Sequence, residues 1–457
     1  MRPSKFTARI VLPYTKEEVY EWHLRERTFF RFFPSWEKAT FLESIDWPGK
    51  QTKFSCSLER GCFKAYYLFR CQYPNHQLIL RTKLEKGPFR SFDVTTELRS
   101  EGKGVELLET VEYLLYLPWL LPEYRESRVR NRFKRFFDHK HSILHKDLDL
   151  LKRIGRQKRL RILVTGANGL VGSALVSFLK AMGHEVASLL RKKGKVHNKD
   201  ELIFDPLSFQ GDRSLLEGFD AMIHLSGESI QGRWSRKKKE KILRSREDVT
   251  RHIVKILTSL KEPPKVFLCA SAVGFYGDCG DEVVTETHRK GEGFLADVCQ
   301  AWESAASFLR TADVRVVHLR FGVVLSSKGG ALRKMLSYFK LGLGAPLGKG
   351  DQYMSWIAID DVLGAIYHAL LTEELKGAVN VVSPSPVTNL EFSKVLTERL
   401  YKPLLPAISA PLLRLIFGEG ADPLLLASIR ATPKKLLDTG YVFRYPDLTS
   451  AFSHLVY

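Results

Sequence analysis

The chain has 457 residues, of which 44% are hydrophobic and 11% aromatic, and its formal net charge at pH 7 is +20. This length exceeds what one ordinary hydrophobic core can hold, so the sequence predicts two or three domains of a soluble globular protein. No stretch approaches the roughly 18–20 apolar residues of a membrane span, and the N-terminus has no apolar signal region, which indicates a cytoplasmic protein.

Cysteine and histidine spacing narrows the kinds of site that we expect. No two cysteines form a C-x-x-C pair, so neither a zinc site nor a redox motif is predicted, and free buried thiols in a reducing compartment are expected. The six cysteines are Cys56, Cys62, Cys71, Cys269, Cys279 and Cys299. The histidines show no ligand spacing either, so we expect no metal.

The positive charge is densest between Arg125 and Arg161, where basic residues alternate with aromatic ones such as Phe133 and Phe137. A basic face of this kind could meet RNA or an anionic membrane surface. The interleaved aromatic residues favour another interpretation, an amphipathic helix whose charges lie in solvent. We therefore expect no nucleic-acid partner.

Residues 1–150 have the pattern of an α+β domain. A strand at Lys5–Leu12 precedes a helix that begins near Thr15, whose hydroxyl can cap the first turn, and a long helical pattern at Glu123–Leu151 closes the segment. Between these helices the sequence predicts strands at Gln51–Leu58, Phe63–Tyr73, Gln77–Glu85, Phe92–Leu98 and Val105–Leu115. Together these elements predict a curved antiparallel sheet that grips a helix.

Three stretches cover much of this segment: TKEEVYEWHLRERTFFRFFPSW, KGPFRSFDVTTEL and RFFDHKHSILHKDL. On these stretches the segment resembles the START/polyketide-cyclase-like (SRPBCC) superfamily. The resemblance implies a helix-grip fold with a pocket for a lipid-like, apolar ligand. A second interpretation stays open, in which the domain has a filled core and serves for partner docking or stabilisation.

The remaining chain has a different pattern. Residues 151–160, with the basic stretch Lys152–Arg159, are predicted to be a linker. From 161 to 384 strands alternate with helices, which predicts a doubly wound parallel Rossmann sheet with its ligand at the carboxyl ends of the strands. The predicted strands are Ile162–Val164, Val186–Leu190, Ala221–Leu225, Lys265–Ala270, Val314–Leu319 and Val379–Val382. Residues 385–457, rich in Leu and Pro, are predicted to form a small helical cap over that crevice.

Three glycines follow the first of these strands at the spacing G-x-x-G-x-x-G. Gly166 and Gly169 can adopt backbone angles that a Cβ would forbid, and Gly172 lets the helix at Leu170–Lys180 approach the strand. The N-terminus of that helix presents unpaired N–H groups to an anion. The sequence therefore predicts a binding site for a dinucleotide pyrophosphate.

The residue after the second strand discriminates between the two dinucleotides. In an NAD-preferring unit an acidic residue there receives the ribose 2′-hydroxyl. Here the strand Glu185–Leu190 runs into Arg191, whose guanidinium can hold a 2′-phosphate through two parallel charge-assisted bonds. We predict NADP(H) with Arg191 as the selecting residue; the alternative is a solvated basic turn.

Seven blocks between residues 161 and 450 carry a second resemblance. They are ILVTGANGLVGSAL, IHLSGESI, RWSRKKKEKILRSR, SAVGFYG, LRFGVVLSSKGGAL, QYMSWIAIDD and FGEGADPLLLASIRATPKKLLDTGYVF. On these blocks the chain resembles the atypical extended short-chain dehydrogenase/reductases of the "epimerase family protein", or sugar-nucleotide-epimerase-like, branch.

This second resemblance implies a role for particular positions along the cofactor. The pyrophosphate would be held by Gly166, Asn168, Gly169, Leu170 and Val171, and the 2′-phosphate by Arg191. The adenosine would lie beside Leu225, Ser226 and Gly227, and the nicotinamide end would be bordered by Arg320, Phe321, Gly322 and Val323.

The usual proton donor of that superfamily is missing. Its Tyr-x-x-x-Lys pair lies on one helix face and passes a proton while the cofactor passes a hydride. No tyrosine of this chain has Lys four residues on, and the corresponding helix carries Phe294 and Val298. Ser271 and Tyr276 remain as candidate catalytic residues, each with a packing or capping role as the alternative, whereas Glu303 is expected to be solvated or a helix partner.

Three classes of function follow. The first is an NADP(H)-dependent oxidoreductase or epimerase-type enzyme that acts on a small-molecule or nucleotide-linked substrate with a non-standard proton donor. The second is a non-catalytic NADP(H)-binding sensor or assembly factor, and the third is a lipid-like ligand-binding protein that acts through residues 1–150. The blocks around the nicotinamide end favour the enzyme.

Overall fold

The computed structural model describes residues 3–25, 27–41, 51–60, 63–72, 78–102, 104–116, 122–155, 158–190, 200–203, 205 and 213–457. These residues divide into two compact units. Unit 1 contains the described residues of Met1–Arg159 together with Ser177–His184. Unit 2 contains those of Leu160–Val176, Glu185–Lys193 and Asp200–Tyr457.

Among the described residues of unit 1, seven strands form one antiparallel sheet in the order β1-β7-β6-β5-β4-β3-β2. The strands are β1 Ser4–Leu12, β2 Lys38–Phe41, β3 Gln51–Arg60, β4 Phe63–Gln72, β5 Leu78–Lys86, β6 Phe89–Glu101 and β7 Gly104–Leu115. The first strand pairs with the last, so that Ser4 lies opposite Tyr113 and Leu12 opposite Val105. Burial alternates along β7, which is typical of a sheet with one face against the core.

The sequence-based prediction of strands in this unit is confirmed, apart from Tyr73 and Gln77, which lie outside the described residues. The strand β2 was not predicted, because four residues are too few to show an alternating pattern. Register shifts occur between β4 and β5, β5 and β6, and β6 and β7. Irregularities of this kind bend strands and increase the local twist of a sheet.

The helices of unit 1 are α1 Lys16–Leu24, α2 Thr28–Phe32 and α3 Pro122–Ile154. Thr15 caps α1 as predicted, since its hydroxyl accepts a hydrogen bond from the Glu18 N–H and the Glu18 carboxylate accepts one from the Thr15 N–H. The predicted linker starts too early, because α3 continues to Ile154. Two basic residues in the last turn, Lys152 and Arg153, complement the negative end of the helix dipole there.

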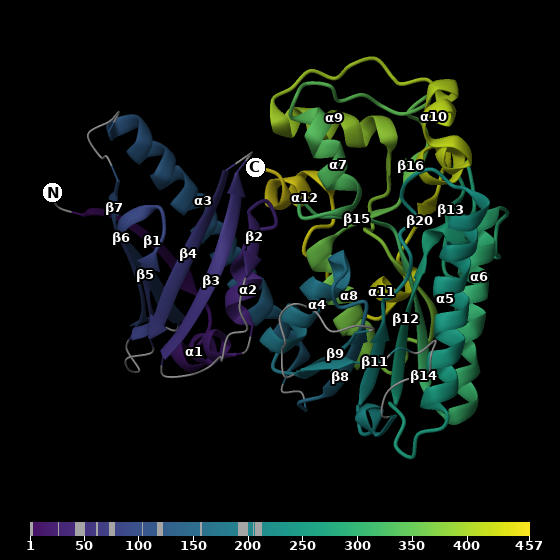
Figure 1. The fold of residues 1–457 in the computed structure, drawn as a ribbon, viewed down its shortest axis with the longest axis horizontal. Helices are drawn as coiled ribbons and strands as arrows, with labels where there is room; N and C mark the ends of the chain where they lie inside the picture. The colour runs from purple at the N-terminus through teal and green to yellow at the C-terminus, as the bar shows by residue number, and fades with distance from the viewer. Residues whose placement is uncertain are drawn as a thin grey trace. The chain divides into compact units, whose positions relative to one another are not determined.

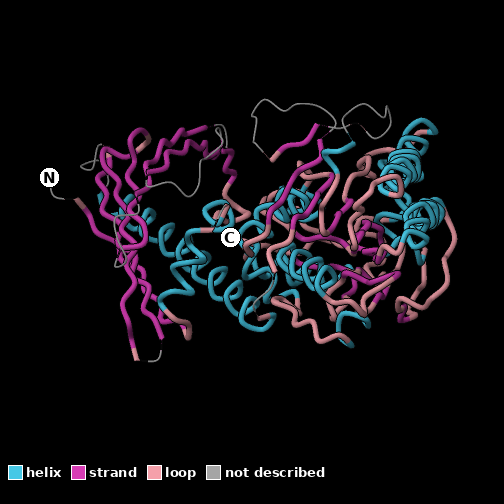
Figure 2. Tube along the Cα trace, turned by 90° about the horizontal axis from the view of Figure 1, so that it is seen from below, coloured by secondary structure: helices cyan, strands magenta, loops and turns pink. Residues whose placement is uncertain are grey.

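The core of unit 1 joins its first strand and helices to the centre of the sheet. The fully buried Trp22 of α1 lies in one cluster with Leu12 of β1, Leu107 of β7 and Leu144 of α3. In Figure 2 the strands of this unit gather toward the N-terminal end of the chain, whereas strands and helices are interleaved through unit 2.

Unit 2 contains a parallel sheet in the order β10-β9-β8-β11-β12-β14-β18 among its described residues. The strands are β8 Arg161–Thr165, β9 Glu185–Leu190, β10 Glu201–Ile203, β11 Ala221–His224, β12 Val266–Ala272, β14 Arg315–Phe321 and β18 Gly377–Val381. This order confirms the predicted Rossmann-like sheet. The three-residue β10 was not predicted, because it is too short to show a pattern.

Helices cover both faces of this sheet, whose central strand β11 is buried along its whole length. They include α4 Leu170–Ala181, whose residues from Ser177 on belong to unit 1, and α5 Arg236–Leu257, α6 Phe294–Ser307, α7 Gly330–Phe339 and α8 Ile359–Leu371. Ile253 of α5 and Trp302 of α6 belong to one buried cluster with Phe267 of β12. Figure 1 shows α5 and α6 together on one side of the sheet and α8 on the other side. Within the described ranges no helix combines the length and the apolar character needed to cross a bilayer.

Residues 385–457 are mainly helical, as predicted for a cap, but they share the core of unit 2. Their helices are α9 Asn389–Leu400, α10 Ala410–Phe417, α11 Lys434–Asp438 and α12 Leu448–Leu455. Phe392 of α9 and Phe452 of α12 lie in one buried cluster with Leu332 of α7 and Trp356.

Short strands also join this segment to earlier parts of unit 2. The strand β20 Arg430–Ala431 pairs with β13 Val283–Val284, and β19 Val387–Thr388 pairs with β16 Tyr353–Met354. A further pair forms between β15 Val323–Leu325 and β17 Trp356–Ala358.

The cysteines in the described part of the chain are free thiols, as expected. Cys56, Cys71, Cys269 and Cys299 are buried, and Cys279 is half-buried. Cys62 lies outside the described residues.

A buried carboxylate joins α8 to the C-terminal segment. Asp361 is fully buried and accepts hydrogen bonds from the backbone N–H groups of Arg444 (2.6 Å) and Tyr445 (2.9 Å) and from the Tyr441 hydroxyl (3.1 Å). Burial raises the pKa of Asp361 to about 6, although these hydrogen bonds act in the opposite direction. The carboxylate therefore satisfies three donors of the C-terminal segment inside unit 2.

We expect Asp361→Ala to lower the free energy of unfolding by about 2–4 kcal/mol, because each buried N–H left without an acceptor costs about 1–3 kcal/mol. Urea unfolding followed by circular dichroism measures the change. Asp438→Ala is the matched control: the side chain of this aspartate is exposed and pairs with Lys434 on its own helix, so about 0.5 kcal/mol or less is expected. Equal midpoints for the two variants would contradict the anchoring role of Asp361.

Candidate functional site

The candidate site lies where the strand order of the parallel sheet reverses. From β8 the chain moves outward to β9 and β10, and then returns to β11 on the other side of β8. In open α/β sheets ligands bind outside the carboxyl ends of the strands at such a point. The turns that follow β8 and β11 therefore form the walls of the candidate site.

The turn after β8 brings two segments of backbone into close contact. Gly166 has a φ of +68°, and a Cβ there would lie 2.8 Å from the carbonyl carbon and oxygen of Leu225. A Cβ on Gly172 would lie 2.2 Å from the carbonyl oxygen of Gly166. Any side chain at either position would thus force strand, turn and helix apart.

Gly169 differs from the expectation, since its φ does not lie in the left-handed region. Its N–H donates a hydrogen bond of 2.9 Å to the Gly166 carbonyl, and a Cβ would come within 3.2 Å of the same oxygen. The constraint at Gly169 is therefore the tightness of the turn and not a special backbone angle.

The outer side of this turn is open. Asn168 and Gly169 are exposed, and Leu170 and Val171, both half-buried, begin α4. The first N–H groups of a helix have no partner within it. Backbone without side chains beside a helix N-terminus fits a pyrophosphate, so the residues present suit a dinucleotide.

The turn after β11 forms the second wall. The Leu225 N–H lies 3.3 Å from the Thr165 carbonyl and 3.2 Å from its hydroxyl, and donates to both. Ser226 is half-buried and Gly227 exposed. A Cβ on Gly227 would lie 3.2 Å from the guanidinium carbon of Arg246.

Arg246 of α5 supports this second wall, and the sequence did not point to it. Its Nη1 donates hydrogen bonds of 3.0 Å to the carbonyls of Glu228 and Ile242. Its guanidinium also lies 5.0 Å from the centroid of the Trp302 ring. Only the fold brings these groups together, so no local signal could have found this arginine.

A buried histidine lies beneath the two turns. His224 is fully buried at the end of β11, with Nδ1 2.7 Å from the Thr165 hydroxyl and Nε2 3.0 Å from the Thr250 hydroxyl. Burial lowers the pKa of His224 to about 3, so the ring is neutral at physiological pH. It links β8, β11 and α5 directly under the candidate site.

Arg320, one of the residues expected at the nicotinamide end, belongs to a buried polar network. Arg320 donates to Glu303 through Nε (2.8 Å to Oε1) and Nη2 (2.9 Å to Oε2), and the Ser271 hydroxyl donates to the same carboxylate (2.7 Å). The Arg320 guanidinium carbon lies 3.5 Å from the centroid of the Phe275 ring. All three polar residues are buried.

The burial of Glu303 and its pairing with Arg320 correct the prediction that this residue is solvated or a helix partner. A pattern in the sequence could have found it: along α6 it follows Cys299 by four residues and precedes Ala306 by three, and both are buried. An acidic residue on the buried face of a helix requires a buried cation, which here is Arg320.

Tyr276 belongs to the same network. Its hydroxyl donates to Asn380 Oδ1 (2.7 Å) and accepts a hydrogen bond from Arg320 Nη1 (3.0 Å). Burial raises the pKa of Tyr276, although Arg320 acts in the opposite direction. Both Ser271 and Tyr276 thus have protein partners for their hydroxyls, and their catalytic assignment stays a prediction.

The other predicted positions lie in packed backbone or outside the described residues. Gly322 lies against β17, where a Cβ would be 2.5 Å from the Ser355 carbonyl oxygen, and the Val323 N–H donates to that oxygen (2.7 Å). Phe321 is half-buried at the end of β14. Arg191 lies outside the described residues, so its predicted role is not tested.

Comparisons with known proteins agree with this geometry. Residues 162–382 match the model of the NAD dependent epimerase/dehydratase family, and residues 408–455 match that of a domain of unknown function (DUF1731). The epimerase family protein Mb2239 of Mycobacterium bovis is 38% identical over 299 residues, which are 64% of this chain and 96% of that protein.

Two solved structures resemble the chain over different lengths. The human epimerase family protein SDR39U1 (isoform2) with NADPH is 33% identical, with a TM-score of 0.60 over 65% of this chain and 99% of that one. The nucleoside-diphosphate sugar epimerase from Corynebacterium glutamicum is 28% identical, with a TM-score of 0.81 over 99% of this chain and 90% of that one.

We expect Gly166→Ala to weaken NADPH binding at least tenfold, because the added methyl group would collide with the Leu225 carbonyl and push the two turns apart. Isothermal titration calorimetry with NADPH measures this loss. Gly440→Ala is the matched control, since Gly440 also has a positive φ (+80°) but no atom within 4 Å of its Cβ position. Equal weakening in both variants would indicate that backbone strain, and not the close contact, is responsible.

We expect the stability of the protein to fall as the pH is lowered from about 6.5 toward 3. The unfolded chain binds a proton at His224 near pH 6.5, whereas the folded chain does so only near pH 3. Each such histidine contributes up to about 1.4 kcal/mol per pH unit, and His318, whose pKa burial lowers to about 4, acts in the same direction. Urea unfolding at several pH values measures the slope.

His224→Gln removes the titrating ring and should reduce this slope while it lowers stability at neutral pH. An unchanged slope would show that His224 does not hold a neutral ring in the folded protein.

Proposed function

This chain belongs to the NAD dependent epimerase/dehydratase family, and from that premise we propose that it is an NADP(H)-binding oxidoreductase or epimerase-type enzyme. Its substrate would be a small molecule or a nucleotide-linked compound. The observation that carries the proposal is the contact between the Gly166 turn and Leu225 at the point where the strand order reverses.

In this proposal the pyrophosphate is held by Gly166, Asn168, Gly169, Leu170 and Val171. Leu225, Ser226 and Gly227 run beside the adenosine, and Arg320, Phe321, Gly322 and Val323 border the nicotinamide end. When bound, the nicotinamide supplies or accepts a hydride. The chain itself supplies the open backbone turn and the N–H groups of α4, both of which suit the negative charge of a pyrophosphate.

The choice of NADP(H) over NAD(H) is supported by two observations. Arg191 follows β9 where an acidic residue would favour NAD(H), and its guanidinium suits a 2′-phosphate. The solved structure of the human relative, 33% identical to this chain, is described as containing NADPH.

For proton transfer we keep Ser271 and Tyr276 as the candidate catalytic residues. The phenol of Tyr276 is protonated at neutral pH, as any tyrosine with an ordinary or raised pKa is, so it can serve as a proton donor and not as a base; the burial that raises this pKa also makes it a weaker acid. A substrate would have to replace Asn380 at the Tyr276 hydroxyl or Glu303 at the Ser271 hydroxyl. The Arg320–Glu303 ion pair holds both hydroxyls in place.

A non-catalytic NADP(H)-binding sensor or assembly factor is the second candidate function. The observation in its favour is that both candidate hydroxyls already have buried partners, in a chain without a Tyr-x-x-x-Lys pair. The two functions differ in one respect that can be measured, namely turnover of the bound cofactor.

We also infer that residues 1–150 form a START-like helix-grip domain. The linker predicted at residues 151–160 would begin only after Ile154, where α3 ends. Residues 161–384 would be the cofactor domain, and residues 385–457 its cap. An antiparallel sheet whose first strand pairs with its last, followed by the 33-residue helix α3, supports the first assignment. The similarity of the C. glutamicum structure over 99% of this chain indicates a counterpart of this segment there. No nucleic-acid partner is proposed.

We expect Arg191→Ala to weaken NADPH binding by roughly one to two orders of magnitude and to leave NADH binding nearly unchanged, because a charge-assisted hydrogen bond contributes about 1.5–3 kcal/mol. Calorimetric titration of the purified protein with NADPH, NADP+ and NADH measures both affinities. Lys394→Ala, which removes one exposed cation on α9, is the charge-matched control and should bind NADPH as the wild type does.

Failure of every dinucleotide to bind the wild-type protein would reject both candidate functions. If NADPH binds, its oxidation in the presence of small carbonyl compounds and nucleotide-linked sugars separates the enzyme from the sensor.

A further inference from the structure

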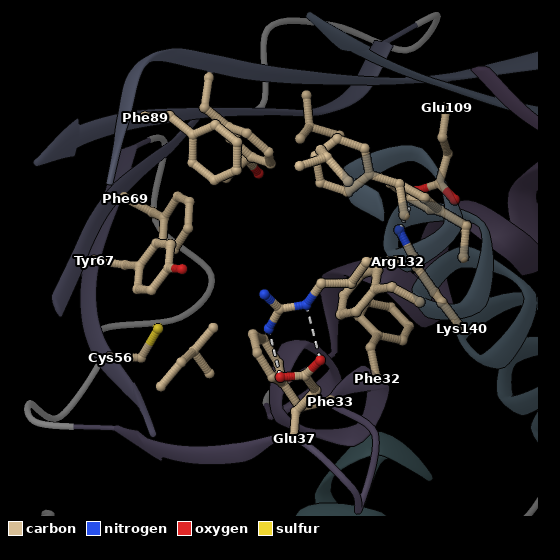
Figure 3. Close-up of a pocket in the computed structure, with 18 of the residues that line it drawn as sticks. Phe32, Phe33, Glu37, Cys56, Tyr67, Phe69, Phe89, Glu109, Arg132 and Lys140 are labelled. Atoms are coloured by element: carbon tan, nitrogen blue, oxygen red, sulfur yellow. Dashed lines mark hydrogen bonds and ion pairs between the residues drawn. The ribbon is translucent and has the colours of Figure 1, made fainter. Parts of the chain in front are cut away.

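Unit 1 contains a partly open cavity of about 610 Å³, lined by residues of α2, α3 and the strands β3 to β7 (Figure 3). Close-packed protein interiors leave few voids larger than a water molecule, whereas pockets for small molecules measure roughly 300–1,000 Å³. A filled core, the second interpretation of residues 1–150, does not fit a void of this size.

The lining of this cavity follows the periodicity of the elements around it. Along β6 every second residue lines it, namely Phe92, Val94 and Thr96, because alternate side chains of a strand point to the same face. Along α3 the lining residues Val129, Phe133, Phe136 and Phe137 share one helix face. Figure 3 shows Tyr67, Phe69 and Phe89 on the wall opposite the helical side chains.

A buried charge cluster forms one end of the cavity. Glu109 of β7 is fully buried and contacts the Lys140 ammonium of α3, while its other oxygen lies 2.7 Å from His141 Nε2. The Thr96 hydroxyl donates to Glu109 across 3.3 Å. Burial alone would raise the pKa of Glu109, but Lys140 and His141 outweigh it and lower this pKa to about 2, so the carboxylate is charged.

A second ion pair lies in the lining, at a less buried position. Arg132 of α3 forms two hydrogen bonds with Glu37, of 3.0 Å from Nε and 2.5 Å from Nη2. Its side chain is 31% exposed, compared with 6% for Lys140. Figure 3 shows its guanidinium on the same side of the cavity as Lys140, facing the aromatic wall.

These two pairs decide which charge a ligand can carry. Two cations of the lining, Lys140 and Arg132, are each paired with a carboxylate, and the third, Arg128, is exposed and also has an interaction partner. A ligand carboxylate would lose its hydration without gaining a free cation, and an uncompensated buried charge is costly. A neutral apolar ligand gains contact with the aromatic walls and meets no such cost.

The buried cluster also offers a hydrogen bond to such a ligand. An ammonium has three N–H donors, and the contact with Glu109 accounts for one of those of Lys140. The same ammonium lies 4.6 Å from the centroid of the Phe32 ring, which itself lines the cavity. A carbonyl or hydroxyl oxygen that reaches Lys140 would satisfy a donor that the apolar walls cannot satisfy.

We propose that unit 1 binds a neutral, largely apolar small molecule in this cavity, oriented by a carbonyl or hydroxyl oxygen that accepts a hydrogen bond from Lys140. The site is separate from the dinucleotide turn, so this inference does not depend on the proposed cofactor. It assigns a ligand class by charge and polarity: a neutral ester, ketone or alcohol is accepted, and the corresponding carboxylate is rejected.

The first test uses the full-length protein and the neutral fluorescent probe Nile red, which carries one carbonyl group. Binding with a stoichiometry of one per chain is expected. Methyl 2-naphthoate and 2-naphthoate then compete for the site; their ring systems are the same, and they differ in charge. The neutral ester should displace Nile red at a concentration at least tenfold lower than the anion.

Two neighbouring substitutions locate the site. Val94→Trp fills the cavity and should weaken Nile red binding at least tenfold, whereas Thr95→Trp places the same side chain on the opposite face of β6 and should leave binding unchanged. Thermal unfolding confirms that both variants fold, and NADPH titration, which reports on unit 2, should be the same for both.

The role of Lys140 is tested by a double substitution, because removal of the lysine alone would leave Glu109 charged and buried. Lys140→Met combined with Glu109→Gln keeps the cavity neutral. Binding of methyl 2-naphthoate should weaken about five- to tenfold, and binding of 2-methylnaphthalene, which has no hydrogen-bond acceptor, should not change.

Three results would overturn the proposal. The first is that Nile red does not bind the wild-type protein at one site, and the second is that Val94→Trp and Thr95→Trp bind it equally well. The third is that 2-naphthoate competes as well as its ester, which would assign the cavity to anions. Equal loss of both naphthalene probes in the double variant would show that Lys140 does not orient the ligand.

Discussion

The contact between the Gly166 turn and the Leu225 backbone is the constraint on which the rest of unit 2 depends. It is possible only because position 166 has no Cβ, and it places the ends of β8 and β11 side by side. The Leu225 N–H then reaches Thr165, and the neutral ring of His224 links Thr165 to Thr250 of α5. Hydrogen-bonded polar side chains thus lie beneath a surface that is formed almost entirely by backbone atoms, and such a surface suits a phosphate group.

The buried charged groups of unit 2 differ from this backbone surface, because they form hydrogen bonds and an ion pair with one another. Glu303 and Arg320 lie beside the hydroxyls of Ser271 and Tyr276, and the two charges are matched by each other within the protein. Such a network is costly to break, because removal of one partner leaves an unpaired buried charge. The hydroxyls of Ser271 and Tyr276 are fixed in position by their hydrogen bonds within this network, and a substrate would have to displace those bonds in order to contact them.

Unit 1 combines the same kinds of interaction with an empty space. Its pairs Glu109–Lys140 and Glu37–Arg132 connect β7 and the segment after α2 to α3, so ionic contacts join the walls of the cavity. Register shifts occur between β4 and β5 and between β6 and β7, and irregularities of this kind bend a sheet. Curvature and charge pairing together allow aromatic walls to stand apart in a folded domain.

Local patterns in the sequence determined the elements of both units and the place of the dinucleotide turn. Hydrophobic periodicity acts over a few residues, which is why strands such as Arg161–Thr165, the cap at Thr15 and the glycine spacing were predictable. The same patterns failed for β2 and β10, which are too short to show a period, and for the helix end at Ile154.

Only the tertiary structure decided which distant residues meet. Tyr276 bonds Asn380, 104 positions away, and Glu109 pairs with Lys140 across 31 positions. Glu303 could have been recognised as buried from its helix face, but its pairing with Arg320 could not, because no pattern along the chain links that helix to the end of β14. The cavity likewise follows from the distance between a sheet and a helix, which no run of residues encodes by itself. The sequence by itself determined the elements and the glycine turn, and the packing of those elements decided the partners and the empty space.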